Sequence, residues 1–371
     1  MMTITGRQLV STLTADGKLT LALEEKAFPA PTGNQVLVKM EAAPINPSDL
    51  FLMTTGADLE NAEYTPGSIV MQLHPQVAAA QAARHGKPQT VGNEGAGTVI
   101  AAGEGEMAQA LMGQRVACVP GNAFSEYALA EAMMCIPLGD HTSEQGASSF
   151  VNPMTALGFV ETAKREGHDA IIHAAAASNL GQMLSRICQE DGMGLVNIVR
   201  KDAQAELLTS QGASHVVNSS TEGLEKSLAA AIGETQAFLG YDPIGGGTTT
   251  DICLRAMERV AASQMTEFSR YGSDQPKKMY IYGRLEMAPT ILTPSYGFGW
   301  TVSGWLLMPF LASCDMQTMI GLRQRVVSGL TSTFASSYKA RVGLEDMLTK
   351  DAIMDYAQMK TGEKYLVTPH G

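Results

Sequence analysis

From Asp169 onward, short apolar runs alternate with amphipathic runs, and this alternation constrains the fold of the chain more than any other feature. The apolar runs have the length of buried strands, and the amphipathic runs have apolar residues at helical spacing. Such an order predicts a parallel sheet covered by helices on both faces. The expected strands are Ala170–Ala174, Leu195–Val199, His215–Asn218, Ala237–Tyr241 and Met279–Tyr282, and the expected helices are Gly181–Glu190, Asp202–Gln211, Thr221–Ala231 and Thr248–Val260.

The first part of the chain has a different, all-β pattern. Asp16-Gly17 predicts a hairpin turn between strands Arg7–Leu13 and Lys18–Leu23, and Gln35–Glu41 is expected as a further strand. Thr55–Pro88 is long for a loop and contains an Ala-rich, helical stretch, which favours a lid or a packing insertion.

The end of the chain returns to helices after a second polar interruption at Ala261–Lys278. Helices are expected near Met316–Leu330 and Leu344–Gln358, followed by a strand at Lys364–Thr368. A length of 371 residues exceeds what one domain usually holds, so two domains are expected.

Charge and cysteine content narrow the classes of partner. A net charge of −11 argues against binding to nucleic acid or acidic membranes, because both require dense Lys and Arg. The five cysteines form no CxxC pair, which fits a reducing cytoplasm. No signal-peptide core is found in residues 1–30, and the longest apolar stretch, Gly304–Ala312, is too short to cross a bilayer. We expect a cytoplasmic protein with small-molecule partners.

The segment from Ile171 to Met183 has the pattern of a dinucleotide-binding turn. A strand runs through small residues, Ala174 to Ser178, into an amphipathic helix that stops at Gly192. Small residues let the backbone approach a pyrophosphate, Gly181 lets the helix pack closely, and the helix N-terminal amides bind phosphate. Ala175 and Ser178 stand where glycines are usual, so an ordinary strand-to-helix turn is the alternative interpretation.

Two cations follow the next expected strand. Arg200 lies nineteen residues after Gly181, about where an acidic residue would bind the ribose of NAD. Arg200 and Lys201 suit a 2′-phosphate instead, which predicts NADPH as the cofactor. A solvated basic pair at a strand end is the alternative.

Six motifs in order resemble the medium-chain dehydrogenase/reductase superfamily, within it the zinc-free NADPH:quinone oxidoreductase branch. The motifs are Ile45–Leu50, Gly92–Val99, Gln114–Val116, Phe124–Ala128, Val151–Ala156 and Gln211–Asn218. The resemblance implies an α/β fold with a Rossmann-like doubly wound parallel sheet and a mostly β, GroES-like N-terminal domain completed by the C-terminus. It implies a substrate-binding domain at 1–152 and 313–371 and a dinucleotide-binding domain at 153–312.

The resemblance also implies roles for individual residues. Asn46 and Thr155 are expected at the nicotinamide, and Arg200 and Lys201 at the adenosine phosphate. The residues expected at the pyrophosphate and along the same cleft are Ala176, Ala177, Ser178, Asn179, Leu180, Gly181, Tyr282, Gly283 and Arg284.

Zinc is not expected. Zinc alcohol dehydrogenases place a Cys ligand in the first motif and a His before the Glu of the second, where this chain has Asn46 and Asn93. The seven histidines form no HxxH pair, and His173 is expected in the core.

A quinone or enone is the expected hydride acceptor. Phe51, Tyr64 and Phe298, with Tyr296, Trp300 and Trp305, are candidates for a flat apolar pocket, although core packing explains many of them. Asn46 is a candidate donor to the substrate oxygen.

Two other functions stay open. The first is an enoyl or alkenal reductase, in which Tyr64 would donate a proton. The second is a cofactor-binding protein with little turnover. A homodimer through an edge strand near Thr301–Leu307 is implied by the resemblance.

Overall fold

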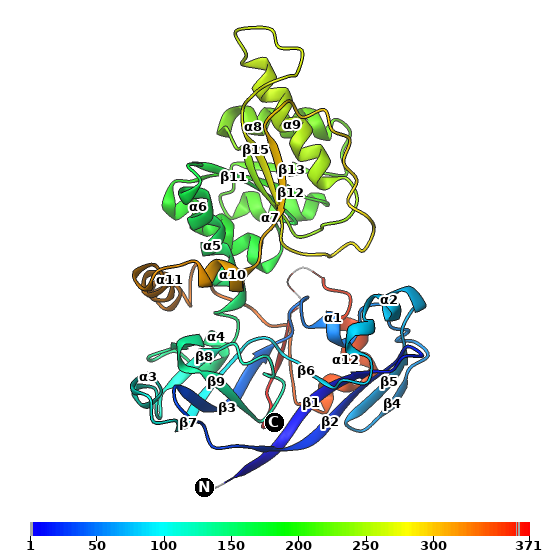
Figure 1. Ribbon diagram of the computed structural model, residues 1–371, viewed down its shortest axis with the longest axis vertical. Helices are drawn as coiled ribbons and strands as arrows, with labels where there is room; N and C mark the ends of the chain where they lie inside the picture. The colour runs from blue at the N-terminus through cyan, green and yellow to red at the C-terminus, as the bar shows by residue number, and fades with distance from the viewer. Residues whose placement is uncertain (1–2, 361, 363) are drawn as a thin grey trace. The chain divides into compact units, whose positions relative to one another are not determined.

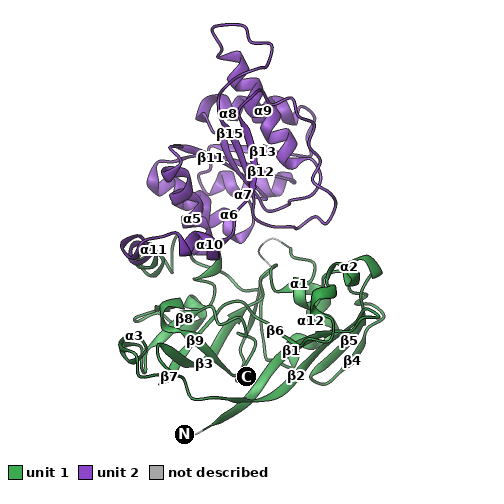
Figure 2. Cartoon of the chain, viewed as in Figure 1, with its two compact units in different colours: residues 1–151, 323–371 green, residues 152–322 purple. Residues whose placement is uncertain are grey.

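The computed structural model describes residues 3–360, 362 and 364–371 and divides the chain into two compact units. Unit 1 comprises Met1–Val151 and Arg323–Gly371, and unit 2 comprises Asn152–Leu322 (Figure 2). The second division falls ten residues beyond the boundary expected at 312/313, inside a helix.

Unit 2 contains the expected parallel sheet, and the alternation in the sequence is confirmed strand by strand (Figure 1). All five strand pairings are parallel, and the order is β13-β12-β11-β14-β15-β16, the doubly wound order with its reversal between β11 and β14. The strands are β11 (Ala170–Ala174), β12 (Gly194–Val199), β13 (His215–Asn218), β14 (Leu239–Asp242), β15 (Lys277–Ile281) and β16 (Trp300–Gly304). The helices are α5 (Val151–Arg165), α6 (Asn179–Asp191), α7 (Asp202–Ser210), α8 (Leu224–Thr235), α9 (Thr249–Ser263) and α10 (Leu307–Ala312), and α11 (Met316–Ser328) continues into unit 1 from Arg323.

One expected helix of this unit starts too early. The sequence pattern begins it at Thr221, whereas α8 starts at Leu224, because Gly223 has a left-handed backbone with φ 79° at the N-cap. β16, which begins at Trp300, is the edge strand of the sheet beside β15.

Unit 1 is mostly β, as expected, and is completed by the C-terminal strand β18, which pairs antiparallel with β3. One sheet has the order β4-β5-β2-β1-β6, and another has the order β10-β8-β7-β3-β18-β17, with β9 also on β3. The strands are β1 (Ile4–Leu13), β2 (Lys18–Phe28), β3 (Gln35–Pro44), β4 (Glu63–Thr65), β5 (Ser68–Gln72), β6 (Gln89–Thr90), β7 (Gly95–Ala102), β8 (Arg115–Cys118), β9 (Tyr127–Glu131), β10 (Cys135–Pro137), β17 (Ala340–Val342) and β18 (Tyr365–Val367). The helices are α1 (Leu50–Met53), α2 (Pro75–Ala80), α3 (Glu106–Ala110), α4 (Ser143–Gly146) and α12 (Lys350–Tyr356), with 3-10 turns η1 (Ala82–Arg84), η2 (Ala132–Met134) and η3 (Asp346–Leu348).

The Thr55–Pro88 segment is part of the sheet rather than a loop. Its strands β4 and β5 form a hairpin about Gly67, and β5 pairs with β2 from Lys18 to Ala22. The sequence pattern missed both strands because they are short and half-exposed. Of the two alternatives, a lid or a packing insertion, the pairing of β5 with β2 favours a packing insertion.

The helix expected at Leu344–Gln358 is interrupted. It divides into η3 and α12 because Thr349 is extended, with ψ 151°. In the described part of the chain, no helix is long and apolar enough to cross a membrane.

Candidate functional site

The parallel strands of unit 2 all end at one edge of the sheet, and the segments that follow them meet there. In doubly wound sheets, ligands bind at this edge where the strand order reverses, which here is between β11 and β14. The turn after β11 is therefore the candidate phosphate site.

The β11–α6 turn has a geometry suited to close approach of a ligand. Ser178 is the N-cap of α6, and its Oγ accepts the backbone amide of Gly181 at 3.1 Å. A Cβ on Gly181 would lie 2.2 Å from the carbonyl oxygen of Ala176, so only glycine fits at this position. The N-terminal end of a helix is a position at which proteins bind anions.

Ala175 is the unexpected feature of this turn. Its φ is 52°, a left-handed conformation that glycine adopts at lower cost. The alanine that weakened the motif in the sequence thus has the backbone of the glycine that it replaces.

Arg200 and Lys201 follow β12 and are both exposed. Lys201 is the N-cap of α7, and the backbone amide of Arg200 donates to Gln204 Oε1 at 3.1 Å. Asp202, in the first turn of α7, accepts a hydrogen bond from the side-chain Nδ2 of Asn218 at 2.7 Å. The two cations thus lie at the same sheet edge as the β11–α6 turn.

Tyr282, Gly283 and Arg284 follow β15 at the same edge. The Tyr282 hydroxyl and His173 Nε2 form a hydrogen bond of 2.7 Å, and the two rings stack with centroids 5.9 Å apart. A Cβ on Gly283 would lie 2.6 Å from the carbonyl oxygen of Pro243, and Arg284 is exposed. Tyr282 thus belongs partly to the packing of the sheet.

The core assignment of His173 is confirmed, because its side chain is fully buried. Burial lowers the pKa of His173 to about 3. Asp242 has a structural role at the end of β14. It is fully buried, and its carboxylate accepts the amide of Ile244 at 2.7 Å and the hydroxyl of Thr250 at 2.8 Å.

In unit 1, Asn46 lies in a buried polar cluster that the sequence pattern did not predict. Its Nδ2 donates to Glu94 Oε1 at 2.9 Å, and Glu94 Oε2 accepts the amides of Phe150 and Val151 at 3.0 and 2.8 Å. Asp49 accepts the amides of Asn46 and Asn93, both at 2.8 Å. The signal for this cluster in the sequence was one acidic residue in each of two motifs, Asp49 in Ile45–Leu50 and Glu94 in Gly92–Val99.

Burial dominates the electrostatics of this cluster. It raises the pKa of Asp49 to about 7 and raises that of Glu94. It lowers the pKa of Lys364, whose Nζ donates to Ser148 Oγ at 2.8 Å. Asn46 Oδ1 is buried and has no hydrogen-bond partner among the described residues.

Within the described ranges, no group of three His, Cys, Asp or Glu side chains is placed to hold a metal ion. Asn93, which stands where zinc alcohol dehydrogenases place a His ligand, donates from Nδ2 to Ser48 Oγ at 2.9 Å.

The residues expected around the nicotinamide and the substrate are spread over both units. Thr155 is buried in α5, Phe51 is 49% exposed on α1, and Phe298 is 79% exposed beside Tyr271. The Tyr64 hydroxyl donates to the carbonyl of Leu59 at 2.7 Å. In unit 2, Trp300 packs on Tyr296, whereas Trp305 packs on Phe310 and Phe159.

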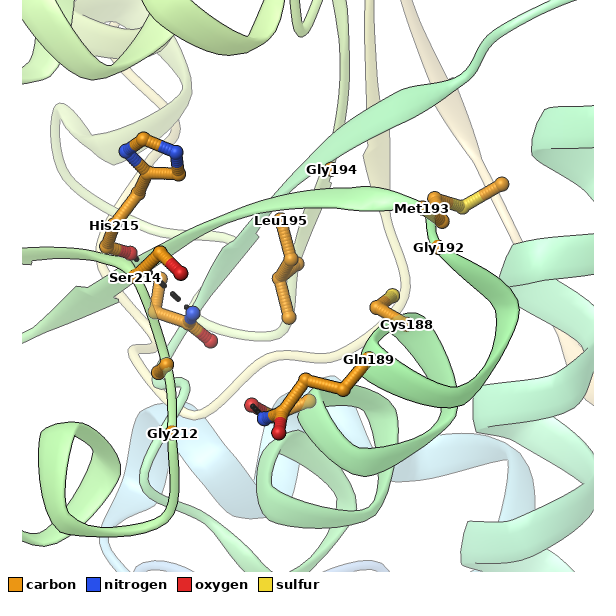
Figure 3. Close-up of a pocket in the computed structure, with 12 residues that line it drawn as sticks. Cys188, Gln189, Gly192, Met193, Gly194, Leu195, Gly212, Ser214 and His215 are labelled. Atoms are coloured by element: carbon orange, nitrogen blue, oxygen red, sulfur yellow. Dashed lines mark hydrogen bonds between the residues drawn. The ribbon is translucent and has the colours of Figure 1, made fainter.

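A cavity of about 240 Å³ lies at the opposite edge of the unit 2 sheet (Figure 3). It is lined by Gly194 and His215, the first residues of β12 and β13, and by Cys188 and Gln189 of α6. It is therefore distinct from the β11–α6 turn.

The doubly wound sheet of unit 2 is of the type that binds dinucleotides at the point where its strand order reverses. The family model of the alcohol dehydrogenase GroES-like domain matches residues 32–140. A putative NADPH:quinone reductase from Mesorhizobium loti has a TM-score of 0.74 and 26% identity, covering 99% of this chain and 100% of that one. The chain is therefore similar to proteins of the medium-chain dehydrogenase/reductase superfamily, quinone reductases among them.

Two curated relatives match more locally. A probable quinone oxidoreductase from Leishmania amazonensis is 27% identical over 66% of this chain and 64% of its own length. A mitochondrial enoyl-[acyl-carrier-protein] reductase from Bos taurus is 28% identical over 66% of this chain and 61% of its own length. The alignments thus span a little less than two thirds of these relatives.

Proposed function

We propose that this chain is an NADPH-dependent, zinc-independent reductase that transfers hydride to a quinone or a conjugated carbonyl. The observation that carries the proposal is the β11–α6 turn, in which Gly181 lies against the Ala176 backbone and Ser178 caps the helix. The small residues of this turn let a pyrophosphate approach the backbone, and the N-terminus of α6 attracts its negative charge. The residues of the turn therefore suit a dinucleotide.

Within this proposal, Ala176 to Gly181 bind the pyrophosphate, Arg200 and Lys201 bind the 2′-phosphate, and Tyr282 to Arg284 border the cofactor. Asn46 and Thr155 contact the nicotinamide end. The bound cofactor supplies the hydride, and the protein holds the cofactor and the acceptor close together in the orientation that transfer requires.

Asn46 is proposed as the donor to the substrate oxygen. Glu94 accepts one of its Nδ2 hydrogens, and this fixes the orientation of the amide. The second hydrogen of that amide is then available to stabilise negative charge on the oxygen. Phe51, Tyr64 and Phe298 are proposed contacts of the acceptor.

Oxidation of NADPH and NADH by purified protein tests the proposal, with quinones, enals, enones and enoyl thioesters as acceptors. We expect faster turnover with NADPH and with quinones or conjugated carbonyls. Cofactor binding without oxidation by any acceptor would instead indicate a binding protein with little turnover.

The match to enoyl reductases favours a second candidate function. An enoyl reductase must also protonate the α-carbon, for which Tyr64 is the candidate. Its hydroxyl would first have to leave Leu59. A saturated thioester product whose formation is slowed in Tyr64→Phe would favour this function over quinone reduction.

A further inference from the structure

Unit 1 buries a guanidinium that has no counter-ion. Arg84, the last residue of η1, is 9% exposed and forms no ion pair with any described residue. Among the described residues its guanidinium has a single, long hydrogen bond, 3.4 Å from Nη2 to Ser11 Oγ, and its Nε and Nη1 have no partner. Removing such a cation from water is costly unless an anion accompanies it.

Ser11, the hydrogen-bond partner of the Arg84 guanidinium among the described residues, is not an anion. Ser11 lies between Leu9 and Leu13 on the buried face of β1, and all three side chains have 0% exposure. The Ser11 hydroxyl already donates to the carbonyl of Leu52 in α1 at 2.6 Å, so it meets Arg84 only as an acceptor. The guanidinium therefore faces the apolar core of the unit.

The side chain of Gln81, three residues before Arg84, is also buried without hydrogen-bond partners among the described residues. Gln81 is 6% exposed, and neither its Nε2 nor its Oε1 has a partner among the described residues. The amide of Arg84 donates to the carbonyl of Gln81 at 3.0 Å, which closes one turn of chain. Residues three apart in such a turn lie on the same face.

We propose that Gln81 and Arg84 form a binding site for the carboxylate of a small organic acid. The guanidinium keeps unpaired N–H hydrogens on Nε and Nη1, and its Nη2 has only the long bond to Ser11, so a carboxylate can pair with Nη2 and either of the other two nitrogens. The Gln81 amide adds a neutral donor. The carboxylate belongs either to the hydride acceptor or to a separate effector. The first case rests on the proposed function, and the second does not.

Thermal unfolding of the full chain tests the site without requiring turnover. Sodium benzoate is the probe, compared with benzamide and with sodium chloride at equal ionic strength. We expect benzoate alone to raise Tm with increasing concentration, because it binds only the folded chain. No rise with benzoate, or an equal rise with chloride, would overturn the proposal.

Variants assign the effect to Arg84. Arg84→Met should lose the benzoate shift and, without benzoate, should unfold at or above the wild-type Tm, because an unpaired buried cation has been removed. Lys87→Met, which removes an exposed cation three residues later, should keep the shift. A full benzoate shift in Arg84→Met would refute the site. If Arg84→Met does not fold, Gln81→Leu and Arg84→Lys should each weaken benzoate binding at least tenfold, and unchanged binding in both would refute it.

The source of the carboxylate is determined with a matched pair of enones, trans-4-oxo-2-pentenoate and its methyl ester. If the acceptor carries the carboxylate, the wild type should prefer the acid in kcat/KM, and Arg84→Met should abolish that preference. If an effector carries it, the ratio should not depend on Arg84 while the benzoate shift in Tm still does. A chain that turns over neither enone but shows the Arg84-dependent shift would retain the site and lose the proposed function.

Discussion

The imidazole of His173 lies in the middle of β11, fully buried against Tyr282 and Phe159. Its Nδ1 has no hydrogen-bond partner among the described residues, and no carboxylate compensates a positive charge there. The ring is therefore neutral in the folded protein, and its burial connects the stability of unit 2 to pH.

We predict that His173 makes the protein less stable in acid. The pKa is about 3 in the folded state and 6.5 for an exposed imidazole, so between these values the unfolded chain binds one more proton. Stability should fall by about 1.4 kcal/mol per pH unit below pH 6.5. Urea unfolding of His173→Phe from pH 7 to 5 should show this part of the slope removed. Exposed His74→Gln is the control, and an unchanged slope in His173→Phe would contradict the prediction.

At the scale of elements, the β11–α6 turn and the end of β12 determine the proposed cofactor site. Both lie at the carboxyl edge of adjacent parallel strands, since Ala174 pairs in register with Ile198. The amide of Ala176 also donates to the carbonyl of Ile198 at 3.0 Å, which attaches the turn to β12.

Gly181→Val should impair dinucleotide binding at least tenfold. Its Cβ would meet the Ala176 backbone at 2.2 Å, so α6 must move and its N-terminal amides move with it. Fluorescence titration of NADPH measures the effect. Gly233→Val in α8, where a Cβ meets no atom within 4 Å, is the matched control. Equal affinities in folded Gly181→Val and wild type would place the cofactor turn elsewhere.

Arg200→Ala and Lys201→Ala should each weaken NADPH binding about ten- to a hundredfold and leave NADH binding unchanged. Each charge-assisted hydrogen bond to a 2′-phosphate contributes roughly 1.5–3 kcal/mol, and NADH has no such phosphate. The ratio of the two dissociation constants is the measurement, with exposed Lys226→Ala as control. Equal losses for both cofactors would assign these residues to the fold or to the pyrophosphate.

At the scale of the whole molecule, unit 1 combines the N-terminal part of the chain with residues from Arg323 onward. β18 completes a sheet begun by β3, and Lys364 beside it contributes to the cluster of Asp49 and Glu94. In zinc relatives, the motifs that contain these carboxylates also supply metal ligands, but Asn46 and Asn93 occupy those positions here.

We therefore predict that the purified protein contains no stoichiometric zinc and that chelators do not reduce its activity. Amide side chains bind zinc poorly compared with Cys and His. Elemental analysis measures the content directly. About one zinc per chain, with activity lost to a chelator and restored by the metal, would reverse this assignment.

The sequence by itself determined the parallel sheet of unit 2, the hairpin at Asp16-Gly17 and the β11–α6 turn. Each depends on neighbouring residues: hydrophobic periodicity, turn chemistry and the absence of a side chain at Gly181 are local constraints. Helix boundaries near Gly223 and Thr349 were less accurate, because backbone angles at single residues decided them.

Only the tertiary structure decided what the local pattern cannot contain. The bond from Asn46 to Glu94 joins residues 48 apart, and the bond from Arg84 to Ser11 joins residues 73 apart. Burial of a charge depends on which distant segments cover it, and no periodicity records that. The buried cluster of Asn46, Asp49, Glu94 and Lys364, and the unpaired guanidinium of Arg84, therefore could not be predicted from the sequence. Both exist only because the sheets of unit 1 bring these distant segments together.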